Sequence, residues 1–276
     1  MAIKTEKLTH SFLLKHPDTA ARVLEKLDPA EVAALFVDLP TRILLPVVRT
    51  MLPSPAGRIL SHLDTEKQVA VFNELDARIT ANAIRIWSRD NRASVLRLLP
   101  KRLSVSVRLL LNYPAGSVGS LMDTDIVTAH MNQTLSEIEE QLRKANADYQ
   151  AEIYIVDDNL KLRGALSIMR ILREDGQKKA RQVMDKTVPT VLATSHVSYV
   201  TGHSAWESRS NLPVVDRENH IVGLLQQTML IDRSKSYNND DANKTHLVTE
   251  ILDAYWSGWK AVFSLVVSDS GLVKRF

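Results

Sequence analysis

The chain of 276 residues contains no cysteine. This absence excludes disulfides, thiolate nucleophiles and cysteine-based zinc or iron–sulfur sites, and it is typical of a reducing compartment. Long apolar runs are also missing. The longest one late in the chain, residues 261–267, is far too short to span a bilayer, and the amino terminus has no apolar signal core. We therefore expect a soluble protein of the cytoplasm.

Recognisable catalytic motifs are missing as well. The eight histidines show neither His-x-His nor His-Glu-x-x-His spacing, and no Gly-x-Ser-x-Gly elbow is present. A Gly-x-x-Gly at Gly116 and Gly119 lacks the preceding strand and the lysine of nucleotide-binding loops. We predict that the protein is not an enzyme and that most histidines lie on the surface.

The net charge is only +3, but positive charge gathers in the first 111 residues. The surplus forms a stripe interrupted by a single acid, Asp90, and made of Arg85, Arg89, Arg92, Arg97, Lys101, Arg102 and Arg108. No aromatic residues interleave with it at a spacing suited to base stacking. The stripe is therefore interpreted as a solvated helical surface, and the sequence argues against nucleic acid as a partner.

A repeat organises the same region. Shifting the sequence by 36 positions aligns Leu24 with Leu60 and Leu96, and Phe36 with Phe72. Apolar residues recur three and four apart within each unit, which predicts helices that offer one face to their neighbours. This period is typical of a helical-hairpin solenoid, so we expect two helices per repeat and a right- or left-curved superhelix.

Helix starts are marked by capping residues. Asp28-Pro29 combines a capping side chain with a proline suited to the first helical position, and Asp64 repeats the cap. Asp18, Ser54 and Asp90 occupy equivalent positions one helix earlier, and they too are predicted to be N-caps.

The second half of the chain contains a duplicated phrase. Residues 153–157 read Ile-Tyr-Ile-Val-Asp and residues 212–216 read Leu-Pro-Val-Val-Asp, and a glycine follows each aspartate after seven positions, Gly164 and Gly223. A Met-Asp pair precedes each copy, at residues 122–123 and 184–185. A strand, a turn and a second strand have been duplicated together with a helix, which predicts a tandem of small α+β modules.

At the junction of the halves, the helical pattern stops at Tyr113-Pro114 and two glycines follow. This junction resembles that of the MgtE-type magnesium transporters, whose cytosolic part joins a helical superhelix to two CBS modules. The junction residues that carry the resemblance are Leu110, Leu111, Tyr113, Pro114, Gly119, Leu121 and Met122. The duplicated Val-Asp and Gly phrases look like the cores of the two CBS repeats.

The predicted fold is therefore multidomain, α followed by α+β. We expect an all-α superhelix over residues 1–112, CBS modules over 113–180 and 181–235, and a linker with a C-terminal amphipathic helix over 236–276. In the tail, apolar residues recur three and four apart between residues 247 and 266, including Trp256 and Trp259. This face requires a cover, for which its own core or a dimer mate, a membrane interface and a partner protein such as a membrane transporter are the alternatives.

The resemblance implies a dimeric magnesium sensor in which Mg²⁺ bridges apposed carboxylates and selects a compact state. The acids that could serve here are Asp90, Glu152, Asp157, Asp158, Asp216 and Glu218. Two family carboxylates near Asp90 are replaced by Asn91 and Ser94. Capping at Asp90 and turn or strand-end roles for the other acids are the alternative interpretation.

Adenine nucleotides are the rival ligand, because CBS pairs in other proteins bind them. The expected signature is a hydroxyl residue after the glycine and an aspartate three positions later that accepts the ribose hydroxyls. The first copy has Ser167 followed by Arg170, and the second copy has lost both. The sequence therefore argues against adenine nucleotide and leaves Mg²⁺ as the candidate ion, with a metal-independent, homodimeric CBS scaffold as the alternative function.

Overall fold

The computed structural model describes residues 11–144 and 151–230. Its contacts divide the chain into two units, residues 1–229 and 230–276. Everything below concerns the first unit, and the predicted amphipathic tail lies outside the described residues. No helix within the two described ranges is long and apolar enough to cross a membrane.

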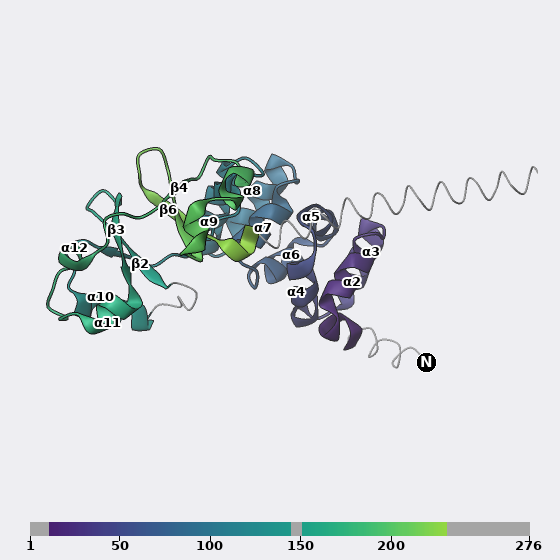
Figure 1. Cartoon of the computed structure of the whole chain (residues 1–276). Helices are drawn as coiled ribbons and strands as arrows, with labels where there is room; N and C mark the ends of the chain where they lie inside the picture. The colour runs from purple at the N-terminus through teal and green to yellow at the C-terminus, as the bar shows by residue number, and fades with distance from the viewer. Residues whose placement is uncertain (1–10, 145–150, 231–276) are drawn as a thin grey trace, which may run out of the picture. The chain divides into compact units, whose positions relative to one another are not determined.

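The first part of the unit is a superhelix of short helices, as predicted (Figure 1). Each helix packs against the helix two places later along the chain, so that these helices form one continuous row. The helices are α2 (Pro17–Leu24), α3 (Pro29–Asp38), α4 (Thr41–Thr50), α5 (Pro53–Ser61), α6 (Thr65–Phe72), α7 (Ala77–Ile84), α8 (Arg89–Leu98) and α9 (Lys101–Asn112).

The 36-residue period contains three helices, and the prediction of two was wrong. Helix α2 corresponds to α5 and α8, and α3 corresponds to α6 and α9. The helices are only 8 to 12 residues long, because a residue with non-helical backbone interrupts the chain at every twelfth position. These N-cap residues are His16, Asp28, Pro40, Leu52, Asp64, Asp76, Ser88 and Pro100. The twelve-residue spacing of the N-cap positions is present in the sequence, but the more obvious 36-residue period of the leucines led to the prediction of two helices.

Two of the predicted caps are confirmed and three are wrong. Asp28 accepts hydrogen bonds from the N–H groups of residues 30 and 31, and Asp64 accepts one from Lys67. Asp18, Ser54 and Asp90 lie instead in the first turn, each the second residue of its helix and two positions after the N-cap residue. A residue there has helical backbone, so its side chain is not placed to cap the N–H groups that follow it.

Apolar side chains of the repeat form the core. Phe36 and Phe72 are both fully buried, whereas Arg108 at the third equivalent position is exposed. Trp87 packs edge-on against Phe72, and its indole N–H donates to the carbonyl oxygen of Gly57 at 2.7 Å. The repeat therefore buries the residues that its period aligned, except where a charged residue breaks the row.

The positive stripe contains one residue with a structural role. Arg85 donates from its two terminal nitrogens to the carbonyl oxygens of Leu110 and Tyr113, at 2.9 and 2.8 Å, and so satisfies the carboxyl end of α9. Burial and the nearby charge of Arg92 lower the pKa of this guanidinium. The interpretation as a solvated surface therefore fails for Arg85, while Arg89, Arg97, Lys101, Arg102 and Arg108 are exposed.

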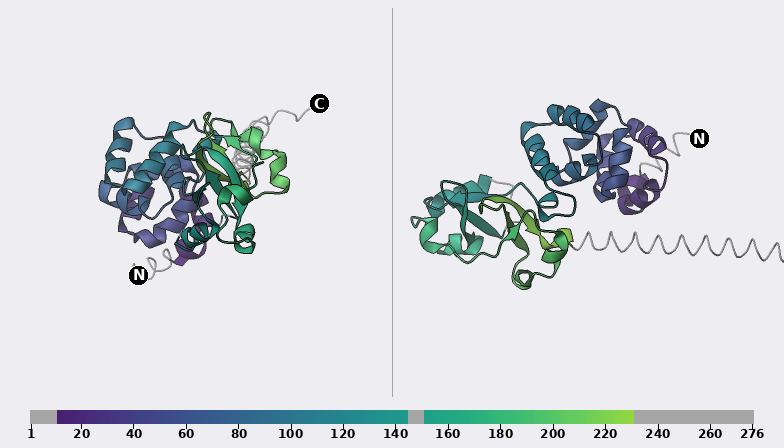
Figure 2. Two further views of the ribbon diagram at one scale, coloured as in Figure 1. Left: turned by 90° about the vertical axis from the view of Figure 1, so that its left-hand side faces the viewer. Right: turned by 90° about the horizontal axis from the view of Figure 1, so that it is seen from above.

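Two three-stranded sheets of the same topology follow. Their strands lie in the teal to yellow-green part of the chain in Figure 2. In each sheet the first strand pairs in parallel with the second, and the second pairs antiparallel with the third. Both central hairpins also carry a register shift at the same place, after Ile155 and after Val214. The duplication read from the sequence is thus a duplication of fold, as expected for an α+β tandem.

The elements of the two modules are brief. The first contains a 3₁₀ turn η1 (Val118–Ser120), β1 (Thr128–His130), α10 (Leu135–Lys144), β2 (Glu152–Val156), β3 (Leu162–Ser167) and α11 (Ile168–Arg173). The second contains α12 (Ala180–Val183), β4 (Val191–Leu192), α13 (Val197–Thr201), a 3₁₀ turn η2 (Ser204–Glu207), β5 (Asn211–Val215) and β6 (Ile221–Gln226).

The modules exchange their leading segments, which explains the repeated Met-Asp pair. Asp123, ahead of β1 in the first module, pairs with Leu224 in β6 of the second through two backbone hydrogen bonds of 2.8 Å. Asp185, ahead of β4 in the second module, pairs in the same way with Ala165 in β3 of the first. Each sheet is therefore extended by a segment that belongs to the other copy, and one apolar cluster draws residues from both modules.

Candidate functional site

The turn after each repeated aspartate is built by that aspartate. In the first copy, one carboxylate oxygen of Asp157 accepts the N–H groups of Asn159 and Lys161, at 2.9 and 3.0 Å. Its other oxygen accepts both Nε and Nη2 of Arg163, at 2.8 and 2.6 Å. Both oxygens are thus occupied by donors from the protein, and the carboxylate is poorly available to an ion.

The second copy builds the same turn but pairs its aspartate differently. One oxygen of Asp216 accepts the N–H groups of Glu218 and His220, at 3.0 and 2.8 Å. The other lies 2.9 Å from Nδ1 of His220, the position that Lys161 fills in the first copy. One ligand atom from each of Asp216, Glu218 and His220 lies within 4.8 Å of the others, and this is the one such group among the residues that the structure describes.

Both turn carboxyls titrate below their ordinary range. Burial alone would raise the pKa of Asp157 and that of Asp216, but hydrogen bonds outweigh it in each case and hold both pKa values low. The main donors are Lys161 and Arg163 to the first and His220 to the second. Nearby, burial and then the charge of Asp216 raise the pKa of Tyr113. Asp216 is therefore charged at neutral pH, and its negative charge helps to raise the pKa of the Tyr113 hydroxyl at the junction.

The remaining acids predicted in the modules lie apart from that group. Asp158 is almost fully exposed and lies 3.0 Å from Nε2 of His130. Glu152 begins β2 and forms an ion pair with Arg209, which also approaches Asp185 at 3.7 Å. Two of the acids predicted from the sequence as metal ligands, Asp216 and Glu218, therefore lie together in the structure. The third member of the group, His220, was not predicted as a ligand, because most histidines were expected to lie on the surface.

On the superhelix, Asp90 is an exposed residue in the first turn of α8. The cap itself is Ser88, whose hydroxyl accepts the N–H of Asn91 at 3.2 Å. Asp90 lies beside Asn91 and, one turn on, Ser94, where the resemblance led us to expect carboxylates. A single exposed carboxylate is a poor site for a hard divalent cation, which prefers several oxygen ligands.

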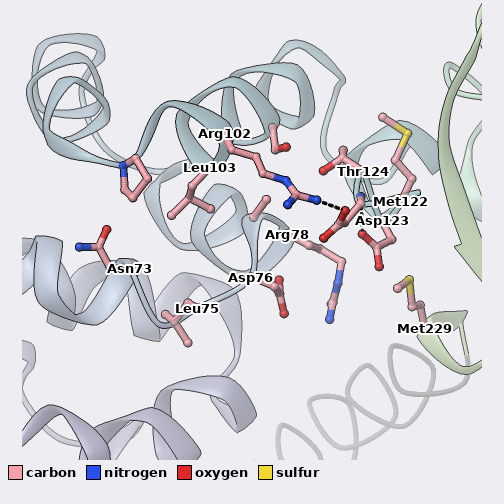
Figure 3. A pocket seen from close by; sticks show the side chains of 14 residues that line it. Asn73, Leu75, Asp76, Arg78, Arg102, Leu103, Met122, Asp123, Thr124 and Met229 are labelled. Atoms are coloured by element: carbon pink, nitrogen blue, oxygen red, sulfur yellow. Dashed lines mark hydrogen bonds and ion pairs between the residues drawn. The ribbon is translucent and has the colours of Figure 1, made fainter. Parts of the chain in front are cut away.

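A cavity of about 460 Å³ lies where the superhelix meets the segment that enters the first module (Figure 3). It is lined from the superhelix by Asp76, Arg78 and Arg102, and from the entering segment by Asp123 and Asp125. Arg102, labelled in Figure 3, forms an ion pair with Asp125. Carboxylates and guanidinium groups from distant parts of the sequence therefore face one cavity.

Sequence reasoning missed this cavity, although one signal was available. Asp123 belongs to the Met-Asp pair that precedes each module, and its neighbour Met122 is fully buried beside Gly223. Asp76 was detectable as a cap at the twelve-residue spacing, and it accepts the N–H of Ile79 at 2.7 Å. Their meeting in one cavity depends on the path of the chain between them, which no local pattern encodes.

Comparison with known proteins identifies the parts of the chain. Residues 15–116 match the MgtE intracellular N domain family, and residues 118–176 match the CBS domain family. The magnesium transporter MgtE of Thermus thermophilus is 28% identical over 169 residues, which cover 59% of this chain. The matched part spans only 38% of that transporter's length.

Solved structures agree with the fold. The cytosolic domain of the Mg²⁺ channel MgtE, solved in complex with ATP, is 26% identical with a TM-score of 0.55, covering 77% of this chain and 92% of that one. The soluble part of a magnesium transporter, 16% identical, gives a TM-score of 0.57 and covers 84% of this chain and 98% of its own. Residues 15–116 thus correspond to an MgtE intracellular N domain and residues 118–176 to a CBS domain, and together they resemble the cytosolic domain of the Mg²⁺ channel MgtE.

Proposed function

We propose that this chain is a magnesium-responsive regulatory protein of the cytoplasm, whose compact state Mg²⁺ stabilises at the cavity between superhelix and CBS region. The observation that carries the proposal is that Asp76 and Asp123, from the two parts of the chain, line the same cavity. Carboxylates brought together repel one another unless a hard divalent cation neutralises them, so an ion bound there favours the closed arrangement.

The arginines of the cavity set the strength of this response. Arg102 already neutralises Asp125 without metal, so Mg²⁺ competes with a guanidinium for that carboxylate. We therefore expect a response at millimolar rather than micromolar Mg²⁺. At ten times its dissociation constant, an ion that binds only the folded state adds about 1.4 kcal/mol to the free energy of unfolding.

The test is a Mg²⁺ titration of the full chain, followed by melting temperature and by hydrodynamic radius. The substitution Asp123→Asn keeps the oxygen that accepts the N–H of Asp125 but removes the charge, and it should abolish the response. The matched control is Asp158→Asn, at an exposed carboxylate outside the cavity. No change in the wild type with Mg²⁺ would contradict the proposal and favour the metal-independent scaffold.

A second candidate ligand is ATP, favoured by the complex of the related cytosolic domain. That complex weakens the expectation from sequence that adenine nucleotide is not bound. In the first module Ser167 accepts the N–H of Arg170 at 3.2 Å as the cap of α11 and keeps its O–H as a donor, but Arg170 stands where the aspartate for the ribose is expected. ATP binding would then rest on other groups, and a parallel titration with ATP in place of Mg²⁺ tests it directly.

Homodimerisation through the CBS modules completes the proposal. Met169 and Leu172 on α11, and Tyr199 on α13, are exposed apolar side chains. These side chains offer an apolar surface that a second copy of the chain would bury in a dimer interface. Light scattering after gel filtration should report a dimer for the wild type and a monomer for Leu172→Glu. A monomeric wild type would refute this part of the proposal.

A further inference from the structure

We propose that Asp216, Glu218 and His220 form a binding site for a divalent transition metal of the Zn²⁺ class, separate from the response to Mg²⁺. The donor set is one imidazole nitrogen and two carboxylate oxygens within 4.8 Å of one another. Imidazole suits Zn²⁺ and its neighbours, whereas Mg²⁺ prefers oxygen ligands and keeps much of its water. The histidine therefore decides the class of ion.

The turn holds two of the three donors in place without an ion. Asp216 is fixed by two backbone N–H groups, and His220 directly precedes the return strand β6, with its ring directed at the second oxygen of Asp216. Glu218 is exposed and closes the group from the solvent side. A metal would replace the proton shared between Asp216 and His220, and water would fill the remaining positions.

The neighbouring module supports the turn. Asn219, in the left-handed region at φ 67°, donates from its side chain to the carbonyl oxygen of Leu162 at 3.1 Å, and its own carbonyl accepts the N–H of Leu162. The site therefore lies on a turn that bridges the two modules. An ion bound there would stiffen that bridge, because the turn could no longer open without losing a ligand.

The first copy supplies a control within the same chain. Its turn has the same backbone hydrogen bonds around Asp157, but Lys161 replaces the histidine and Arg163 occupies the free oxygen. The two copies differ at the positions that a metal needs. The duplicated framework therefore serves the turn in both copies, and the metal ligands are particular to the second.

The test is calorimetric titration of the full chain with Zn²⁺ in a background of Mg²⁺, with Co²⁺ absorption as a second readout. We expect one saturable Zn²⁺ ion per chain that a roughly hundredfold excess of Mg²⁺ does not displace. His220→Gln should weaken Zn²⁺ at least roughly tenfold, and Glu218→Gln should weaken it less. His130→Gln, which removes a histidine paired with only one carboxylate, is the matched control.

Hydrogen exchange gives an independent measurement. Zn²⁺ should slow exchange of the Leu162 amide, whose acceptor lies on the turn, in the wild type and in His130→Gln but not in His220→Gln. Equal Zn²⁺ affinity in wild type and His220→Gln, displacement by comparable Mg²⁺, or no saturable binding would each overturn the proposal. Because the readout is Zn²⁺ binding, a failed Mg²⁺ response leaves this result unaffected.

Discussion

A methyl group added at Gly164 tests whether the exchange of segments between modules holds the CBS region together. In Gly164→Ala the new carbon would lie 2.5 Å from the carbonyl oxygen of Asp185, where real contacts essentially never fall below 3.0 Å. The obstructing atom belongs to backbone, so the neighbouring segment must move by about 0.5 Å or more. Side-chain rotation cannot relieve the contact.

The cost follows from what that movement breaks. Asp185 and Ala165 exchange two backbone hydrogen bonds of 2.9 and 2.8 Å, each worth about 0.5–1.5 kcal/mol. Overpacking adds about 1–3 kcal/mol. We therefore expect a loss of about 2–6 kcal/mol in the free energy of unfolding, and a fall in melting temperature of about 4–24 °C for a chain of this size.

Calorimetry and urea unfolding measure the effect against a matched control. Gly202→Ala adds the same methyl group where no atom lies within 4 Å, and its backbone at φ −96° accepts alanine without strain. Gly223→Ala repeats the perturbation in the second copy, where the carbonyl oxygen of Asp123 would lie 2.7 Å away. If Gly164→Ala melts at the same temperature as Gly202→Ala, the exchanged segments do not contribute the stability that we assign to them.

Three further predictions concern other parts of the fold. Asp157→Asn should flatten the acid side of the curve of unfolding free energy against pH. The depressed pKa of this carboxyl adds stability above its pKa in the unfolded chain, and that stability is lost as the pH falls through its pKa in the folded protein. Urea midpoints measured across pH will report the change. Trp87→Phe should cost about 1 kcal/mol in chemical unfolding, since it removes the buried hydrogen bond from the indole N–H to the carbonyl oxygen of Gly57. Asp28→Ala should cost about 1 kcal/mol and Asp90→Ala clearly less, since only Asp28 caps a helix, and equal losses in thermal melts would show that the cap contributes nothing.

Local patterns in the sequence determined most of the architecture. Helical periodicity and capping residues such as Asp28 and Asp64 act within a few residues, so the helices and the superhelix were predictable. The repeated Val-Asp and Gly phrases likewise specified two equivalent hairpins, because strand, turn and strand are adjacent in the chain. The error of two helices per repeat arose because the leucine period was read without the shorter spacing of the caps.

Tertiary structure alone decided what those hairpins do. The leading segments cross between modules, so the reason for each glycine lies in a residue far along the chain. Arg163 forms an ion pair with Asp157, whereas His220 and Glu218 lie close to Asp216, although the two repeated sequence segments are alike. The meeting of Asp76 with Asp123 likewise depends on long-range packing. Pairing partners are set by the path of the whole chain, and for that reason the sequence determined the framework while the fold decided where charge and ligands converge.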